Sequence, residues 1–238
     1  LAAKGIVYAR SMYNIQQTVT PNNGRLEVKL DCIRPDVEVR YTMDGSLPTA
    51  QSALYTRPLM LTGTKTIKAA TFSAGKQQTL ELPVVWNPAT AKVIKSTGAD
   101  NIGRLVNGVR GSLKYTDSEW CSWMKNDTVS FTLDLKKPET VNRLTLGSIT
   151  NYGMAAHKPA KIEVLISADN KDYRKVSGKS FTKEEIFREG TFREDIPFKI
   201  GEKARYIRVV AYGAGDCPFT HVRPGQEARI YFDEVIVE

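Results

Sequence analysis

The sequence predicts an all-β protein made of two consecutive β-sandwiches, and three observations lead to that prediction. Apolar and polar residues alternate along many short segments, which is the pattern of strands that bury one face. Gly, Pro, Asn and Asp turns separate these segments, as in antiparallel sandwiches. The 238 residues are 41% hydrophobic and 25% charged, which is enough for two cores of ordinary size.

The alternating segments lie on both sides of an Asn87-Pro88 break. Helical spacing is scarce, and the one clear candidate runs from Thr182 to Arg188, with Thr182 as the cap and acidic residues in the first turn. The predicted strands are residues 26–30, 37–43, 80–86, 129–135, 162–166 and 207–211.

The domain boundary is expected within 86–91, where a predicted strand meets a connector that contains proline. Residues 1–88 then match the size of an immunoglobulin- or fibronectin-like sandwich. Residues 91–238 suit a jelly-roll sandwich. A catalytic (β/α)8 barrel needs about 250 residues of alternating strand and helix, so this chain does not hold one.

The net charge of +8 raises the possibility of nucleic-acid binding. The charge divides evenly, however, because residues 1–90 carry +4 and residues 91–238 carry +4. Neither part has a concentrated basic patch, so we expect no nucleic-acid partner. No apolar run reaches the ~18 residues that a membrane-spanning helix needs, so we expect no membrane span.

The cysteines and histidines do not follow the spacing of a structural zinc site. Cys32, Cys121 and Cys217 include no Cys-x-x-Cys pair, and the chain has only two histidines, so zinc is not expected. A disulfide between Cys121 and Cys217 and a pair of buried free thiols both remain compatible with the sequence.

The first half of the chain contains a specific turn motif. Residues 41–49 read Tyr-Thr-Met-Asp-Gly-Ser-Leu-Pro-Thr, in which a strand enters an Asp44-Gly45 turn. With the sequence that follows, this string resembles the C-terminal sandwich module of chitobiases and β-N-acetylhexosaminidases, across residues 20–86. We interpret the motif as a rigid scaffold, because no second carboxylate is placed to form a catalytic pair with Asp44.

The second half resembles the coagulation-factor type C, or discoidin, domain. Bacteria use this jelly-roll to bind galactose or other glycans. The resemblance rests on several modest matches that occur in the family's order, and these are residues 105–112, 120–123, 129–135, 160–167, 206–209 and 233–237.

The resemblance to the discoidin family implies a structural calcium ion. The positions that match the family's ligands are the Arg104 backbone, Asn107, Ser112 and Glu234. Asn107 stands where the family usually has an aspartate. The loss of that charge should weaken calcium binding without preventing it, since calcium accepts amide and carbonyl oxygens.

The pattern of the last strand gives an independent reason to consider Glu234. It shares the register of Ile230, Phe232 and Ile236, which places a carboxylate on an apolar face. Burial of an unpaired carboxylate costs free energy, and a cation, a partner arginine or a bulge that turns Glu234 outward would each remove that cost. The Asp233-Glu234 pair superficially resembles the catalytic pair of glycoside hydrolase family 20, but neighbours on a strand point to opposite faces, so we reject that role.

Candidate glycan-binding residues lie in predicted loops. Aromatic faces suit the apolar side of a sugar ring, and a few polar groups fix its hydroxyls. For the two tryptophans, core packing is the alternative. The candidates are Trp120, Trp123, Tyr152, His157, Phe219, His221 and Arg223.

The leading hypothesis is a non-catalytic C-terminal region of a family 20 β-N-acetylhexosaminidase. The second domain would bind a glycan that contains galactose or N-acetylhexosamine, and would keep the enzyme's own catalytic barrel near substrate. The alternative is a pair of structural or protein-interaction modules that stabilise the barrel. The resemblance also implies export, to the periplasm or outer surface of a Gram-negative bacterium.

Overall fold

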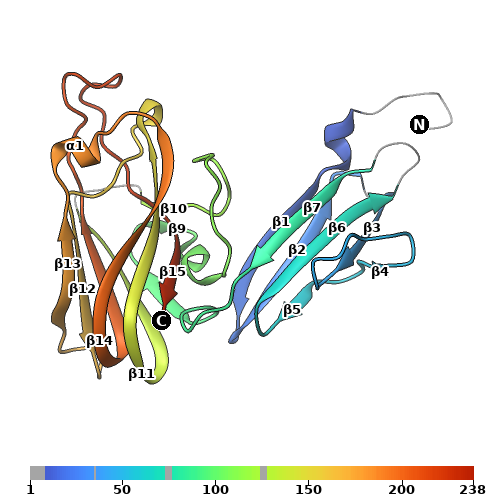
Figure 1. Ribbon diagram of the computed structural model, residues 1–238, viewed down its shortest axis with the longest axis horizontal. Helices are drawn as coiled ribbons and strands as arrows, with labels where there is room; N and C mark the ends of the chain where they lie inside the picture. The colour runs from blue at the N-terminus through green and yellow to red at the C-terminus, as the bar shows by residue number, and fades with distance from the viewer. Residues whose placement is uncertain (1–8, 35, 73–76, 124–127) are drawn as a thin grey trace. The chain divides into compact units, whose positions relative to one another are not determined.

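The computed structural model of the protein describes residues 9–34, 36–72, 77–123 and 128–238. The chain forms two compact units, Leu1–Trp86 and Asn87–Glu238 (Figure 1). The predicted all-β fold class is confirmed. Within the described residues, no helix has the length and apolar content needed to cross a bilayer.

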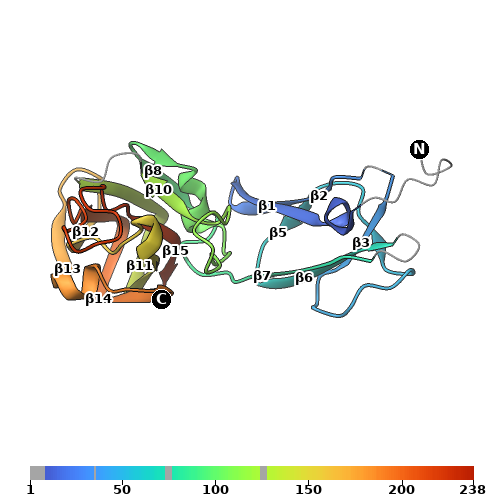
Figure 2. The same cartoon turned by 90° about the horizontal axis from the view of Figure 1, so that it is seen from above.

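The first unit is a sandwich of two antiparallel sheets, which Figure 2 shows as two layers. Its buried side chains, such as Leu26, Val28 and Ile67, sit at alternate strand positions, as the period of two requires. A short 3-10 helix, η2 (Arg10–Tyr13), precedes the strands. The strands of one sheet lie in the order β1 (Ile15–Asn22), β2 (Arg25–Cys32) and β5 (Leu59–Leu61). The strands of the other lie in the order β4 (Ala53–Leu54), β3 (Glu38–Thr42), β6 (Lys65–Phe72) and β7 (Thr79–Val84).

The Asp44-Gly45 motif is a hydrogen-bonded turn. Asp44 Oδ1 accepts from the Ser46 backbone N–H at 3.0 Å and from the Ser46 hydroxyl at 2.6 Å. Gly45 takes a φ of +81°, which glycine adopts without strain. These contacts hold the turn rigid and leave the Asp44 carboxylate engaged in its own loop.

The second unit is built around two long antiparallel strands, β11 (Thr128–Asn151) and β14 (Thr191–Tyr212). The other elements of this unit are β8 (Val93–Ser96), β9 (Ala99–Asp100), η3 (Ile102–Val106), β10 (Cys121–Trp123), η4 (Tyr152–Met154), β12 (Lys161–Ser167), β13 (Arg174–Ser180), α1 (Lys183–Ile186) and β15 (Tyr231–Val237). The first part of β11 pairs with β8 and with the last part of β14, which continues to β12 and β13. The last part of β11 pairs with the first part of β14 and with β15, which continues to β10 and β9.

The predicted short helix is confirmed as α1. Thr182 Oγ1 accepts from the Glu185 backbone N–H at 3.2 Å, and the Glu185 carboxylate accepts from the Thr182 backbone N–H at 2.8 Å. This reciprocal pair is a capping box, which satisfies two amide groups that the first helical turn leaves unpaired.

Aromatic rings form the centre of the second core. The Trp123 indole stacks on Phe131 at 6.4 Å between ring centroids and meets Phe232 edge-on at 5.9 Å. All three side chains are almost fully buried. Burial of one large apolar side chain contributes about 1.5–3 kcal/mol, so this cluster is a main source of the unit's stability.

The last strand, β15, contains a bulge against β11. Leu146 pairs with Val235 and Ser148 pairs with Phe232, so Asp233 and Glu234 both lie opposite Gly147. Both acidic side chains are buried, at 0% and 1% exposure. The strict alternation expected for this strand is therefore wrong at this point, because the bulge lets two neighbouring carboxylates enter the protein.

Gly147 provides the space for the Asp233 carboxylate. A Cβ atom on residue 147 would overlap the Asp233 side chain and the Arg110 guanidinium. We expect Gly147→Ala to destabilise the protein by roughly 1–3 kcal/mol in chemical denaturation. Gly153→Ala is the matched control, because its Cβ would meet only Asn151 Oδ1, at 3.7 Å. Equal stability of the two variants would contradict this role for Gly147.

Candidate functional site

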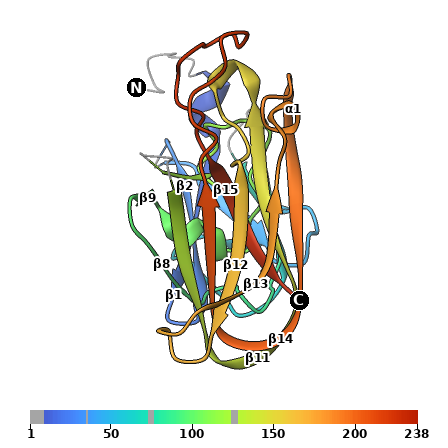
Figure 3. The same cartoon turned by 90° about the vertical axis from the view of Figure 1, so that its left-hand side faces the viewer.

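Two loops of the second unit meet at one end of the sandwich (Figure 3). One follows β11 and the other precedes β15. The Arg229 backbone N–H donates to the Ala155 carbonyl at 2.8 Å, and the His157 N–H donates to the Arg229 carbonyl at 2.9 Å. Ala156 also bridges to Asn151, which closes the first loop on itself. These backbone contacts fix the two loops against each other.

The loop before β15 is folded tightly and presents an apolar tip. The Cys217 N–H donates to the Gln226 carbonyl at 2.8 Å, and the Gly225 N–H donates to the Cys217 carbonyl at 3.0 Å. At the tip, Phe219 is 97% exposed and Val222 is 66% exposed. An aromatic ring held in solvent on a braced loop gains nothing from the protein's own core, so it is available for a ligand.

His157 and His221 form a buried pair beneath this tip. Their Nε2 atoms lie 3.1 Å apart. His157 Nδ1 lies 2.9 Å from the Ile186 carbonyl, which can only accept, so Nδ1 carries the proton. The Arg223 backbone N–H donates to His221 Nδ1 at 2.9 Å. The proton of a neutral His221 is therefore on Nε2, and it donates to the free Nε2 of His157.

Burial determines the charge of this pair. It lowers the pKa of His157 to about 4, and the neighbouring His221 adds to the effect. Burial also lowers the pKa of His221. Both imidazoles are therefore neutral at pH 7, and the pair contributes no positive charge to the loop surface.

Tyr152 and Arg223, which are both partly exposed, lie beside the histidine pair. The Tyr152 ring is tilted over His221 at 3.9 Å between centroids, and its hydroxyl donates to the Thr220 carbonyl at 3.5 Å. The Arg223 guanidinium donates to the Gly153 carbonyl and, at 3.3 Å, to Gln226 Oε1. These contacts join the two loops through side chains as well as backbone.

The structure brings together five of the seven predicted glycan residues. Phe219 faces solvent, Tyr152 and Arg223 are partly exposed, and His157 and His221 are buried. The two tryptophans lie elsewhere in the fold and are each only 3% exposed. Trp120 Nε1 donates to the Ser112 carbonyl and Trp123 Nε1 donates to Ser96 Oγ, both at 3.0 Å. Core packing describes both tryptophans, and neither indole offers a face to sugar.

A second polar cluster surrounds Asn107, directly after η3. Its amide Nδ2 donates to Glu119 Oε2 at 2.6 Å, and its Oδ1 accepts from the Val109 N–H at 2.9 Å. Glu234 Oε2 accepts from the Gly108 N–H at 3.1 Å. The three side chains of Asn107, Glu119 and Glu234 are buried, and we call them the oxygen cluster.

Within the part of the chain that the structure describes, the hydrogen bonds that reach the two carboxyl groups of the oxygen cluster come from neutral groups, which include the side chains of Asn87 and Asn107 and the Gly108 N–H. Among the described residues, no ion pair joins Glu119 or Glu234 to a basic side chain. Burial raises the pKa of Glu119, and it raises that of Glu234 well above its usual range. Arg110 instead pairs with Asp233, at 2.9 Å. The sequence left a cation, a partner arginine and an outward bulge as alternatives for Glu234. A bulge is present, but Glu234 remains buried, so the bulge does not turn it outward.

The oxygen cluster differs from the predicted metal set. The Arg104 carbonyl accepts from the Asn107 N–H at 3.4 Å, so it lies beside the cluster. Ser112 is exposed, and its backbone N–H donates to Asp117 Oδ2 at 3.0 Å. In the described residues no contact links Ser112 to Asn107 or Glu234. The sequence did not single out Glu119, because a lone acid in a polar segment gives no signal of burial.

Two hard-oxygen carboxylates and an amide oxygen, buried without a basic partner, are the donor types that calcium prefers. By donor type, these residues fit a calcium ion, with Glu119 in place of Ser112. Glu119 would then supply the negative charge that Asn107 lacks.

Comparison with protein-family models assigns both units. Residues 90–222 match the F5/8 type C domain, which is more than half of the chain. The chain belongs to the F5/8 type C domain family. Residues 13–81 match the chitobiase/beta-hexosaminidase C-terminal domain. The resemblances seen in the sequence are confirmed for both halves.

Several solved structures are similar to part of this chain. Chitosan-binding module 1 of a Paenibacillus sp. IK-5 chitosanase/glucanase is 18% identical, covers 64% of this chain and 98% of its own, and has a TM-score of 0.41. CpGH89CBM32-4 of Clostridium perfringens, solved with GlcNAc-alpha-1,4-galactose, is 14% identical, and the match covers 64% of this chain and 94% of that one with a TM-score of 0.42. The C-terminal domain of a Bacteroides fragilis chitobiase is 12% identical, and the match covers 61% of this chain and 92% of that one with a TM-score of 0.38. No curated protein matches the sequence.

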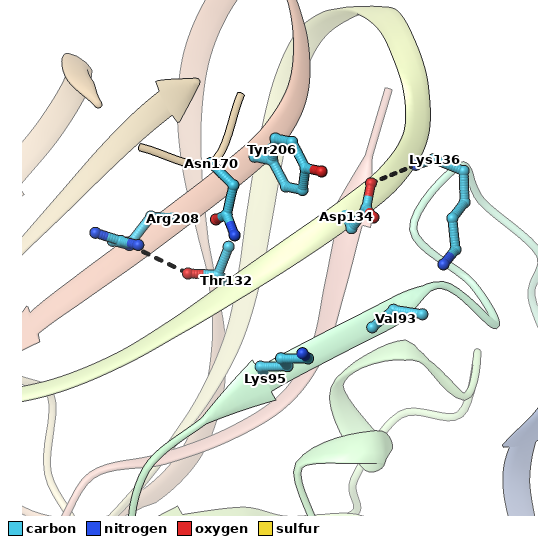
Figure 4. A pocket seen from close by; sticks show the side chains of 8 residues that line it. All are labelled: Val93, Lys95, Thr132, Asp134, Lys136, Asn170, Tyr206 and Arg208. Carbon is cyan, nitrogen blue, oxygen red and sulfur yellow. Dashed lines mark hydrogen bonds between the residues drawn. The ribbon is translucent and has the colours of Figure 1, made fainter. Parts of the chain in front are cut away.

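The F5/8 type C domain also has a cationic pocket that the sequence did not indicate. It measures about 470 Å³ and lies against β8, β11 and β14 (Figure 4). Arg208 Nε donates to Thr132 Oγ1 at 3.1 Å, and the guanidinium of Arg205 lies 4.7 Å from the Tyr206 ring centroid. One face of that ring is therefore already covered. The residues that line the pocket are Val93, Lys95, Thr132, Asp134, Lys136, Asn170, Tyr206 and Arg208.

The cysteines of the described residues are all free. Cys121 and Cys217 are both buried, so the alternative of buried free thiols describes them. Burial raises the pKa of Cys121 to about 12 and also raises that of Cys217. Cys121 packs in the main core, whereas Cys217 lies in the loop before β15, beside the histidine pair.

The neutral state of His157 predicts a pH dependence of stability. An unfolded histidine takes up a proton near pH 6.5, whereas His157 in the folded protein does so near pH 4. The unfolded state thus binds more protons as pH falls through this window, and the free energy of unfolding should fall by roughly 3 kcal/mol.

Imidazole NMR in the presence of EDTA measures this directly, with the His221→Gln spectrum assigning the two histidines. We expect the His157 resonances to stay constant from pH 8 down to about pH 5 and to titrate near pH 4. Titration of His157 near pH 6.5 would show that the ring is open to solvent.

Proposed function

We propose that the F5/8 type C domain is a non-catalytic glycan-binding module, and that the tip of the loop before β15 contacts the sugar. The observation that carries this proposal is Phe219, an aromatic side chain 97% exposed on a loop braced by its own backbone hydrogen bonds. A braced loop loses little conformational entropy on binding, so the ring's contact area contributes more fully to affinity.

The chemistry of the tip suits one sugar at the end of a glycan chain. The apolar face of a pyranose would stack on the Phe219 ring, and Val222 would extend the apolar contact. Arg223 and the Tyr152 hydroxyl supply polar groups at the edge of this surface. The buried histidines would brace Tyr152 from below rather than touch the ligand. A surface this small predicts weak binding to a single sugar.

Weak binding is sufficient if the module works as a tether. A parent enzyme held near its polymer gains effective concentration from each appended module, even when one module binds weakly. The match of residues 13–81 supports a parent of the hexosaminidase type. We propose a β-N-acetylhexosaminidase whose catalytic barrel lies outside this chain, exported to the periplasm or outer surface of a Gram-negative bacterium.

Substitution of Phe219 tests the glycan site. Removal of the buried contact of a phenyl ring costs about 1.5–3 kcal/mol, so Phe219→Ala should weaken sugar binding at least tenfold. Phe219→Tyr should bind like the wild type, because it keeps the aromatic face. Isothermal calorimetry against N-acetylglucosamine, galactose and GlcNAc-α-1,4-galactose measures the affinities.

Leu113→Ala is the matched control, because Leu113 is an exposed apolar residue, at 58%, outside the tip. Its affinity should equal that of the wild type. Absence of binding to every sugar at millimolar concentration would reject the glycan-binding role and favour structural support of the barrel. Equal losses in Phe219→Ala and Leu113→Ala would move the contact away from the tip.

We also propose that the oxygen cluster holds a structural calcium ion. Glu119, Glu234 and the Asn107 side chain would supply oxygen ligands, with the Arg104 carbonyl beside them. The buried carboxylates support this proposal, because their ionised forms are costly without a cation. Calcium there would fix the loop after η3 to β15 and would have no part in catalysis.

The calcium proposal predicts opposite effects of one substitution in two buffers. In EDTA, Glu234→Gln should unfold at the same temperature as the wild type or higher, since it removes a carboxyl group whose ionised form is costly to bury without a cation. In millimolar calcium the unfolding temperature of the wild type should rise by several degrees, whereas that of the variant should not change. Glu202→Gln is the control, because Glu202 is a surface acid paired with Arg174. A wild type that calcium does not stabilise would contradict the proposal.

A further inference from the structure

A third side chain joins the histidine pair beneath the loop tip. The Cys217 sulfur and ring nitrogens of His157 and His221 all lie within 4.8 Å of one another, and the three residues are buried. In the described residues, the Cys217 thiol has no disulfide or hydrogen-bond partner. Two imidazoles and a thiol, buried and close together, are the donors that zinc and its neighbours in the transition series prefer.

The spacing of the donors is close to that of a tetrahedral metal site. With Zn–N of about 2.0–2.1 Å and Zn–S of about 2.3 Å, ligand atoms around one ion lie about 3.3–3.6 Å apart. The two Nε2 atoms are already 3.1 Å apart. The sulfur lies within 4.8 Å of a ring nitrogen of each histidine, so ligation needs it to approach that nitrogen by no more than about 1.5 Å.

One histidine is already oriented for ligation. His157 donates its Nδ1–H to the Ile186 carbonyl at 2.9 Å, so its Nε2 carries the lone pair, which now accepts from the His221 Nε2–H. A carbonyl acceptor behind a metal-bound imidazole is the usual outer contact of such sites, since it fixes both the tautomer and the ring. The backbone N–H of His157 also donates to the Arg229 carbonyl, so the backbone at His157 is fixed as well.

We propose that His157, Cys217 and His221 bind one divalent transition-metal ion of the zinc class, with the fourth position open to water. On binding, the thiol loses its proton to solvent, and the Nε2 proton that His221 shares with His157 is displaced. His221 then carries its proton on Nδ1 and gives up the 2.9 Å hydrogen bond from the Arg223 N–H. That bond is worth about 1 kcal/mol, which three metal–ligand bonds exceed.

This site is separate from the oxygen cluster in both place and chemistry. Calcium prefers oxygen donors, whereas this set offers nitrogen and sulfur. Two of its ligands lie on the loop that presents Phe219, so the metal would cross-link that loop to His157, beyond β11. The inference does not depend on sugar binding, and a metal ion can occupy the site whether or not a glycan binds above it.

Cobalt serves as the probe, because Co²⁺ replaces zinc in such sites and reports its ligands by absorption. The full chain is treated with EDTA, desalted and titrated with Co²⁺ under reducing conditions. We expect one equivalent to bind, with the intense visible bands of four-coordinate cobalt and a thiolate-to-cobalt charge-transfer band. Zinc should then remove both signals, and calcium should not.

Variants identify the ligands. Cys217→Ser should lose the charge-transfer band and bind cobalt about 100-fold more weakly, and His221→Gln should weaken binding similarly. Cys32→Ser is the matched control, since Cys32 is the same type of residue in the first unit, and it should behave as the wild type. Thermal unfolding of each variant in EDTA shows whether it folds, so that a lost signal is assigned to a lost ligand.

The proposal is overturned if the wild type gives no charge-transfer band at stoichiometric cobalt. It is also overturned if folded Cys217→Ser binds cobalt as tightly as the wild type. Either result would leave His157 and His221 as a hydrogen-bonded pair with a buried thiol beside it. Glycan binding measured in EDTA is independent of both outcomes.

Discussion

The bulge in β15 is the constraint on which the second unit depends. It places Asp233 and Glu234 opposite Gly147 and sends both carboxylates into the protein. Asp233 Oδ2 accepts from Arg110 Nε and from the Gly111 N–H, both at 2.9 Å, while Glu234 accepts from the Gly108 N–H. The loop after η3 is therefore held to the last strand by two buried acids rather than by apolar packing alone. Such anchoring is directional, because a hydrogen bond to a charged group fixes both distance and angle.

This arrangement separates structural from exposed aromatic residues. Anchoring of the loop after η3 leaves Trp120 and Trp123 buried, so these rings stabilise the sandwich. The loop before β15 is held mainly by its own backbone hydrogen bonds and by contacts to the loop after β11, and it keeps Phe219 in solvent. The same strand thus connects a rigid acidic anchor at its bulge to the loop directly before it, which bears Phe219. The histidine pair and Cys217 lie at the base of that loop, where a metal ion would add a further cross-link.

Local patterns in the sequence predicted what local physics determines. The period of two gave the strands, Thr182 and Glu185 gave the capped helix, and Asp44-Gly45 gave the turn. Contacts between distant segments left no such pattern. Glu119 reaches Asn107 only because the chain folds back, and Cys217 meets His157 across 60 positions. The bulge was considered, but its direction depends on the space at Gly147, which strand periodicity does not encode. The exposed state of Phe219 and the buried state of the tryptophans likewise follow from tertiary packing.

The central claim is that the end of the sandwich bearing Phe219 is the recognition surface. Residue-resolved NMR titration of the full chain with N-acetylglucosamine and galactose tests this most directly. Backbone shifts should change within the two loops, at residues 151–157 and 216–226, and should stay constant around the cationic pocket of Figure 4. Changes centred on Lys95, Tyr206 and Arg208, with none in the two loops, would contradict the claim.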